Sequence, residues 1–454
     1  MLRAPFKIRS TTVKKYGEDA LPEGSAIADW PIGYDDLEPY YEKVEQLIGI
    51  SGEAGANPFE SPRKSDYPLP GLRRSGLGDL AYDAMKTSGY HPFTQPAAIL
   101  SEAYKGRPAC SYCGYCTGHG CWNDAKSSTL VSAIAEAEKT GKLEIRVNSR
   151  VTKILSNDKG EVIGVTYIDE SGQEQEQPAG VVILSTYVYE NNRLLLLSTS
   201  DYYKKGLGNN GGNVGKYYMA HSYGGAHGLF PGKDFNLLSG TGSQAVAMDD
   251  FNGDNFDHTG LGFIRGAIAN VAMSESTPIQ RASLLPPGMK GWGAEYKKFI
   301  HDNALGVASF STQLEVLAYE GNFLDLDPTK KDDTGMPVIR ITFNLGENEK
   351  KANQWMNPKM EAVLKEMGAT QTWSYPDPAN IPINSHAYGG TRMGDDPAVS
   401  VVNKYGISHE APNLMVLGGS NWVSTTGYNP TETIEAHAWY ASDYLVQNLA
   451  KIAV

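Results

Sequence analysis

The stretch 413-NLMVLGGSNWVSTTGYNPTETIEAHAWYASDYLVQNLAKI-452 predicts an apolar strand, a glycine turn, a loop and a long terminal helix. At the helix start, the pattern Asn429-Pro430-Thr431-Glu432 predicts Asn429 as the cap and Pro430 as the first helical residue, with Glu432 completing a capping box. A well-capped helix is the simplest interpretation of these four residues. The amides and dipole at such a helix start also favour negative charge.

The rest of the chain predicts two further kinds of structure. Residues 34–48 have apolar side chains at helical spacing, and 127–141 predicts a second helix closed by Gly141. From 143 to 185 the pattern alternates, which predicts a strand, a small meander and a buried strand at 181–185. Residues 212–375 predict an antiparallel sheet with helices.

Length and charge exclude several classes of function. The chain has 454 residues, enough for two or three domains, and a net charge of −12 from 40 basic and 52 acidic residues. This balance argues against nucleic acid or anionic lipid as the main partner, because both favour a basic face. The longest apolar runs are too short to span a bilayer, so no transmembrane segment is expected. The lack of a charged-then-apolar leader favours the cytoplasm, unless a partner carries an export signal to the periplasm.

A histidine in the C-terminal third is a candidate catalytic base. His386 lies in 384-NSHAYGGTRMGDDP-397, which is too glycine-rich for a regular helix. A histidine on a loop is a better candidate than one on an apolar helix face, such as His437, because binding residues concentrate on loops held by a rigid scaffold. An imidazole with a pKa near neutrality suits proton transfer.

Four blocks of the chain carry a family resemblance. They are 28-ADWPIGYDDLEPYYEKVEQLIGISG-52, 108-PACSYCGYCTGHGCWNDAKSS-128, 181-VVILSTYVYENNRLLLLS-198 and the segment from 385-SHAYGGTRMG to the end of the chain. Together they resemble the glucose–methanol–choline (GMC) family of flavin oxidoreductases. The likeness is closest to its sugar-oxidising branch of pyranose oxidases and gluconate 2-dehydrogenase large subunits.

The resemblance implies a fold and a division of the chain. The fold class is α/β plus α+β, with an incomplete Rossmann-like FAD-binding domain and an antiparallel-sheet substrate domain. Residues 105–211 and 380–454 are expected to form the FAD-binding domain. Residues 1–104 and 212–379 are expected to form the substrate-binding or cap region.

The resemblance also implies an activity and its residues. The expected reaction is FAD-dependent oxidation of a secondary alcohol of a sugar, sugar acid or glycoside, with His386 and Asn429 as catalytic residues. Hydride leaves carbon for the flavin while His386 takes the hydroxyl proton. If Asn429 caps the helix through its oxygen, only its NH₂ group faces substrate. The residues expected to bind the cofactor are Val151, Gly418, Gly419, Ser420, Pro430 and Thr431.

One part of the family pattern is missing. The family opens with a βαβ unit carrying G-x-G-x-x-G. The match 206-GLGNNG-211 follows no buried strand and precedes no helix, so it is rejected as a dinucleotide loop. A misplaced start, a separate chain supplying the half-domain or a damaged fragment would each explain this, and truncation of a family enzyme is the expectation. The alternative function is a flavin-free, non-catalytic subunit or remnant.

The cysteines form one short cluster. Cys110, Cys113, Cys116 and Cys121 have the spacing C-x₂-C-x₂-C-x₄-C, which disfavours two strained disulfides. The spacing differs by one residue from part of a bacterial ferredoxin ligand set, so a small iron–sulfur cluster is favoured. Reduced structural thiols and a zinc site stay open as alternatives. This block resembles gluconate- and fructose-type flavin dehydrogenases, some of which pass electrons from FAD through such a cluster to a cytochrome subunit, so the resemblance implies an electron-accepting partner subunit.

Overall fold

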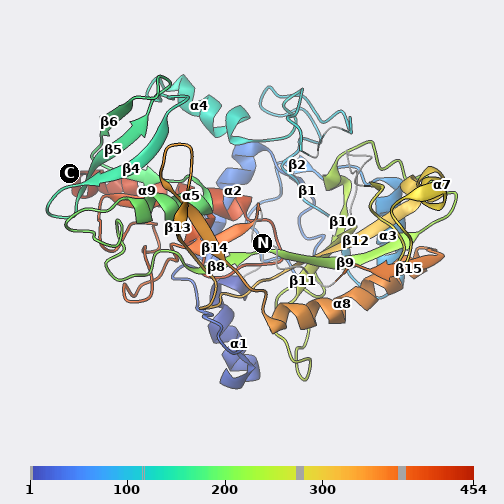
Figure 1. Ribbon diagram of the computed structural model, residues 1–454. Coiled ribbons are helices and arrows are strands. Elements are labelled where there is room, and N and C mark those ends of the chain that lie inside the picture. Colours follow the sequence, from blue (N-terminus) through green and yellow to red (C-terminus); the bar gives the residue numbers. More distant parts are fainter. Residues whose placement is uncertain (1–3, 115, 117, 272–280, 377–384, 454) are drawn as a thin grey trace.

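The computed structural model describes residues 4–114, 116, 118–271, 281–376 and 385–453. It shows a mixed α/β fold built largely on antiparallel sheets (Figure 1). The helices are α1 (Ile8–Tyr16), α2 (Tyr34–Ile48), α3 (Gly76–Thr87), α4 (Ala133–Lys139), α5 (Tyr187–Leu197), α7 (Gly293–Asn303), α8 (Glu347–Glu366) and α9 (Thr431–Ile452). No helix of the described residues is long and apolar enough to cross a membrane.

The largest sheet is six-stranded and antiparallel. In spatial order its strands are β15 (Gln371–Ser374), β9 (Ser222–Leu229), β12 (Val307–Leu314), β11 (Ala267–Val271), β10 (Val246–Met248) and β3 (Pro92–Thr94). Helix α8 packs along one face of this sheet (Figure 1). Phe310 and Leu314 of β12 join Met356 and Met360 of α8 in one buried cluster. The alternate residues of β12 therefore point to the opposite face, because successive strand side chains alternate.

A four-stranded sheet joins two parts of the chain that the sequence assigns to different domains. Its strands are β14 (Pro337–Thr342), β13 (Phe323–Lys331), β8 (Lys216–Ala220) and β16 (Ala387–Gly390), in that order. Ala387 of β16 pairs with Ala220 of β8. The backbone amide of His221 also donates to the carbonyl of His386 at 3.2 Å. The predicted domain boundary at 379/380 lies outside the described residues.

Smaller sheets complete the strand inventory. A meander is formed by β4 (Arg150–Ser156), β5 (Val162–Ile168) and β6 (Glu174–Pro178). Two parallel pairs are β7 (Val182–Leu184) with β17 (Leu414–Val416) and β1 (Ser51–Gly52) with β2 (Leu69–Pro70). The predicted meander and terminal strand–turn–helix unit are present. The strand predicted at 181–185 is also present as β7, but only Leu184 is buried and Ile183 is exposed, so the prediction that it is a buried strand is wrong.

The long terminal helix α9 packs beside α2 (Figure 1). The hydroxyl groups of Tyr41 and Thr433 lie 3.0 Å apart across this contact. Helix α2 ends at Gly49, whose φ of 79° places it in the left-handed region that glycine tolerates. The predicted helix at 34–48 is thus confirmed, with its predicted stop.

Two predictions of secondary structure are wrong in detail. The helix predicted at 127–141 is reduced to α4 and one 3-10 turn at Thr129–Val131. The strand predicted at 143–147 is absent, and its alternating side chains Leu143, Ile145 and Val147 are 41%, 54% and 74% exposed. Without a neighbouring strand in the described chain, that alternation has no ladder to join. The rejection of 206-GLGNNG-211 agrees with the structure, where turns lead into β8.

The predicted helix cap is also wrong. Helix α9 begins at Thr431, Pro430 occupies the cap position, and no side chain caps the helix. The carbonyl of Pro430 accepts the first helical bond from the amide of Ile434 at 3.0 Å. The side-chain oxygen of Asn429 instead accepts a hydrogen bond from another element, Gln313 of β12. A partner distant in sequence has therefore replaced the local cap.

Candidate active site

His386 immediately precedes β16 and contacts two side chains where the chain passes from β8 into β9. Its Nδ1 lies 3.1 Å from Nδ1 of His221 and 3.3 Å from the hydroxyl of Tyr223. Burial lowers the pKa of His386 below its usual value of 6.5. The imidazole is therefore neutral at neutral pH, which is the state that can accept a proton.

His221 keeps its partner histidine in one orientation. It is buried, and burial, followed by the proximity of His386, lowers its pKa to about 3. Its Nε2 lies 3.4 Å from the hydroxyl of Tyr388. Since both rings are neutral, one Nδ1 carries the hydrogen that the other accepts. The contact therefore fixes the relative position of the two rings without placing two charges together.

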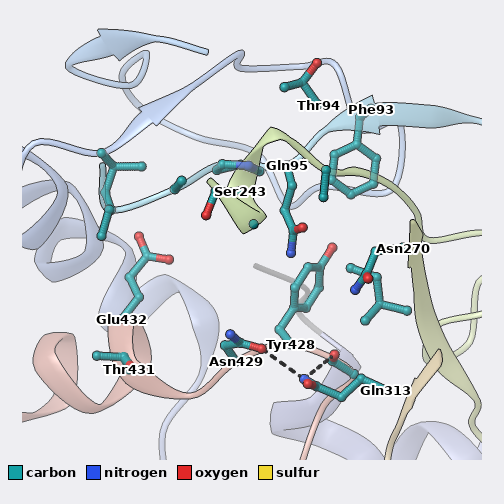
Figure 2. A pocket seen from close by; sticks show the side chains of 18 of the residues that line it. Phe93, Thr94, Gln95, Ser243, Asn270, Gln313, Tyr428, Asn429, Thr431 and Glu432 are labelled. Carbon is teal, nitrogen blue, oxygen red and sulfur yellow. Dashed lines mark hydrogen bonds between the residues drawn. The ribbon is translucent and has the colours of Figure 1, made fainter. Parts of the chain in front are cut away.

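Asn429 lies at the end of the loop that leads into α9. Its Oδ1 accepts a hydrogen bond from Nε2 of Gln313 at 3.2 Å, and the same nitrogen donates to the carbonyl of Gly427 at 2.8 Å (Figure 2). The residue itself is exposed. The amide is thus anchored through its oxygen and open to solvent elsewhere.

One cavity of about 900 Å³ brings the two predicted catalytic residues together. His386, Asn429 and Thr431 all line it. The wall near His386 comes from the six-stranded sheet, with Tyr223, Asn270, Ser311 and Gln313. Its other end is lined by the start of α9, by α2 and by residues 127–129 (Figure 2 shows Thr431 and Glu432 on α9). The volume lies within the range of small-molecule and cofactor sites.

The remaining predicted cofactor residues do not line this cavity. Gly418 precedes the 3-10 turn at Gly419–Asn421, and Ser420 is buried within that turn. Gly418 has a φ of 110° and no atom within 4 Å of where a Cβ would be, so its surroundings are open. Pro430 is buried beneath the start of α9. Val151 lies on β4 of the meander and is 36% exposed.

Sequence reasoning missed the sheet side of the site. Tyr223, Ser311 and Gln313 lie on β9 and β12, and Asn270 lies on β11, where the pairing aligns Gln313 with Tyr223 and Ser311 with Asn270. The alternation of β12 puts Ser311 and Gln313 on the cavity face and Thr312 and Leu314 on the α8 face. Both faces carry a polar residue, so the pattern alone could not show which face meets the cavity.

Comparison with known proteins places this site in a family. Sequence models of the GMC oxidoreductase family match residues 96–222 and 319–438. The gluconate 2-dehydrogenase flavoprotein of Pantoea cypripedii is 32% identical over 98% of this chain and 76% of its own length. The chain belongs to the GMC oxidoreductase family. Like other members of that family, it is an oxidoreductase that acts on CH–OH groups.

Two further similarities agree with this assignment. The fructose dehydrogenase large subunit of Gluconobacter japonicus is 25% identical over 93% of this GMC oxidoreductase and 75% of its own length. The crystal structure of pyridoxine 4-oxidase from Mesorbium loti superposes with a TM-score of 0.60, at 15% identity, over 98% of this chain and 81% of that one. At that identity the likeness shows the fold alone.

GMC oxidoreductases bind FAD, and the cavity of this member has features that fit a flavin. The carboxylate oxygen Oε2 of Glu435 lines the region, is buried and has no hydrogen-bond partner among the described residues. Buried polar atoms in native proteins normally have a partner, so a ligand is the simplest explanation. The start of α9 at Thr431 faces the same space, where its amides can meet an electron-rich ring edge.

A second acid at this end of the cavity is held in an uncommon state. Burial, followed by the neighbouring Glu45 carboxylate, raises the pKa of Glu432. Glu45 in turn forms an ion pair with Arg63. Glu432 therefore holds a proton more readily than a free glutamate, which reduces negative charge beside the helix start.

Asp249 anchors Tyr428 in the loop that leads into α9. Asp249 is fully buried and accepts hydrogen bonds from Asn57, Asn252 and the Tyr428 hydroxyl. Burial raises its pKa to about 6. Since Tyr428 directly precedes Asn429, this contact restrains the chain at the point where it enters the cavity.

The four cysteines surround a second, much smaller cavity. Cys110, Cys113, Cys116 and Cys121 all line a space of about 20 Å³, and all four are free thiols. Backbone amides of Tyr112 and Lys126 lie 3.4 Å from the Sγ atoms of Cys110 and Cys121. As placed, however, no group of three or more His, Cys, Asp or Glu among the described residues could hold a metal ion. The thiols thus share one loop without forming a ready ligand set.

Proposed function

We propose that this GMC oxidoreductase is an FAD-dependent dehydrogenase that oxidises a secondary alcohol of a sugar, sugar acid or glycoside. The observation that carries the proposal is that His386 and Asn429 line one cavity, although they lie 43 positions apart in the sequence. When bound, FAD supplies the hydride acceptor for the substrate carbon. His386 accepts the hydroxyl proton, and Asn429 hydrogen-bonds the same hydroxyl.

The polarity of the cavity wall supports a substrate rich in hydroxyl groups. Tyr223, Asn270, Ser311 and Gln313 line it from adjacent strands, and each side chain carries a hydrogen-bonding group. Curated relatives are named for such alcohols: gluconate, fructose and 2-methyl-1,2-propanediol. An apolar alcohol could not hydrogen-bond to the side chains of Asn270 and Ser311, so a polyhydroxylated substrate is favoured.

The division of the chain is part of the same proposal. Residues 105–211 and 380–454 form an incomplete Rossmann-like FAD-binding domain, and residues 1–104 and 212–379 form the substrate region. The parallel pairing of β7 with β17 supports the first assignment, since parallel strands are typical of α/β nucleotide-binding folds. The exposed apolar side chains at Leu143, Ile145, Val147 and Ile183 support its incompleteness. Val151, Gly418, Gly419, Ser420, Pro430 and Thr431 are the proposed FAD contacts.

Reduction of bound flavin tests the activity. Purified protein is given FAD, freed of excess, and mixed anaerobically with D-gluconate or D-fructose, both of which carry secondary alcohols. We expect at least one of them to bleach the flavin absorbance. The rate should fall as pH drops through a pKa below 6.5, because protonated His386 cannot accept a proton.

Two outcomes would contradict the proposal in different ways. A well-folded protein that takes up no FAD would support the alternative function, a flavin-free subunit or remnant. A protein whose flavin is reduced at a rate independent of pH below neutrality would exclude His386 as the base.

We further propose that the four cysteines bind a small iron–sulfur cluster and that electrons leave through a partner subunit. Cluster binding is supported by the cavity that the four cysteines share and by the two backbone amides near the Sγ atoms of Cys110 and Cys121. A partner subunit is supported by the fructose dehydrogenase relative, which is itself named as a large subunit. Since the thiols are not placed as a ready ligand set, the loop must rearrange to accept the cluster.

Cluster binding has a direct test. Protein purified without oxygen should contain iron and sulfide and show broad brown absorption. Cys113→Ser should remove most of this iron, because thiolate is the preferred cluster ligand. Ser111→Ala, on the same loop, is the matched control and should retain it. Colourless wild-type protein without iron would support reduced structural thiols, and bound zinc would support a zinc site.

A further inference from the structure

Gln313 links the six-stranded sheet to the catalytic loop. It is 7% exposed, and its Nε2 donates both to the Gly427 carbonyl and to Oδ1 of Asn429 (Figure 2). Strand β12 is paired on both sides, with Ile268 and Tyr223 flanking Gln313. The side chain that anchors Asn429 therefore comes from the interior of a sheet rather than from a mobile loop.

The direction of this hydrogen bond decides which end of Asn429 meets the cavity. An amide offers one oxygen that accepts and one NH₂ group that donates. Gln313 engages the oxygen, and no helix cap competes for it. In Figure 2 the nitrogen of Asn429 points away from Gln313. Asn429 therefore presents a donor to whatever occupies the cavity.

A donor at this point suits proton abstraction by His386. A substrate hydroxyl carries a single proton. An Asn429 carbonyl would accept that proton in a hydrogen bond and compete with the imidazole for it. An NH₂ group instead donates to the hydroxyl oxygen and leaves the proton for His386.

We propose that Gln313 is a positioning residue that fixes the side-chain amide of Asn429 with its NH₂ group toward the substrate hydroxyl. The kinetic consequence of this inference rests on the proposed function. The orientation of the Asn429 amide does not, because the Gln313–Asn429 hydrogen bond forms without flavin or substrate. One cross-strand pair of the sheet contacts both proposed catalytic residues. Gln313 binds Asn429, and Tyr223, its pairing partner on β9, contacts His386.

The orientation can be measured without flavin or substrate. In protein labelled with ¹⁵N at asparagine, the Asn429 NH₂ signals are identified by their loss in Asn429→Ala. Gln313→Leu removes the anchor, and Gln313→Glu replaces the donor with a carboxylate of the same shape. We expect both to shift these signals, while Gln173→Leu, an exposed glutamine of the meander loop, leaves them unchanged. Unshifted signals in both Gln313 variants would overturn the proposal.

A double-mutant cycle tests the kinetic role. In protein that retains Asn429, Gln313→Leu should lower kcat/KM for flavin reduction by about 10- to 100-fold. In the Asn429→Ala background, where nothing remains to be oriented, it should change the rate by less than about twofold. Equal losses in both backgrounds would show a merely structural role and overturn the proposal. Thermal unfolding of each variant shows that the rates refer to folded protein.

Failure of the proposed function would look different. If Asn429→Ala and His386→Ala reduce flavin as fast as the wild type, the catalytic assignment fails whatever the ¹⁵N signals show. If these variants are slow but the Gln313 cycle shows no coupling, the positioning role alone fails.

Discussion

We expect His386→Ala to lower the rate of flavin reduction by substrate by about 10²- to 10⁴-fold, the usual contribution of a general base, and to leave FAD bound. The variant removes the imidazole that burial keeps neutral and that His221 and Tyr223 hold at Nδ1. FAD binding should survive, because the proposed FAD contacts lie on other segments. Anaerobic stopped-flow absorbance measures the rate, and the flavin content of the purified variant measures retention.

The matched control for this prediction is His301→Ala. His301 lies on α7, its side chain is 87% exposed, and its Nδ1 lies 2.8 Å from the carboxylate of the neighbouring Asp302. We expect its flavin reduction rate to equal that of the wild type. Equal rates in His386→Ala and wild type would remove His386 from catalysis.

Arg265→Met destabilises the protein by about 3–5 kcal/mol, the largest stability effect that we expect from one substitution. Arg265 is fully buried, and it donates to Glu315 at 2.9 Å and to Asp254 at 3.0 Å. Methionine fills similar space but leaves the Glu315 carboxylate buried without its cation. Urea unfolding monitored by circular dichroism measures the change in unfolding free energy.

An exposed ion pair provides the control for that substitution. Arg340 pairs with Asp325 across β13 and β14, with side chains 47% and 34% exposed. Arg340→Met should change the free energy of unfolding by about 0–1 kcal/mol, because solvent screens such a pair. Similar losses in both variants would mean that the Arg265 network owes its stability to something other than buried charge.

The sequence was most informative where function and local pattern coincide. The glycine-rich loop marked His386 as a candidate base, the family resemblance added Asn429, and the structure brings both residues to one cavity. Gln313 and Tyr223 were not identified, because their relation depends on strand pairing between segments about 90 residues apart. Such pairing has no local signature in a single sequence.

The wrong predictions share a physical cause. Asn429 has the sequence of a cap, but Gln313 offers its oxygen a partner from another strand, and tertiary contact overrides local preference. Residues 143–147 have the alternation of a strand, but the described chain gives them no neighbour to pair with. Local pattern predicts what a segment can form, while the surrounding chain decides whether it does.

Alternate residues of strand β12 have different roles. Ser311 and Gln313 meet the cavity, whereas Phe310 and Leu314 pack against α8. A substitution at Ser311 can therefore change the lining of the cavity while Phe310 and Leu314 continue to pack against α8. The side chains that line the cavity can thus change without changing the side chains that pack the sheet against its helix.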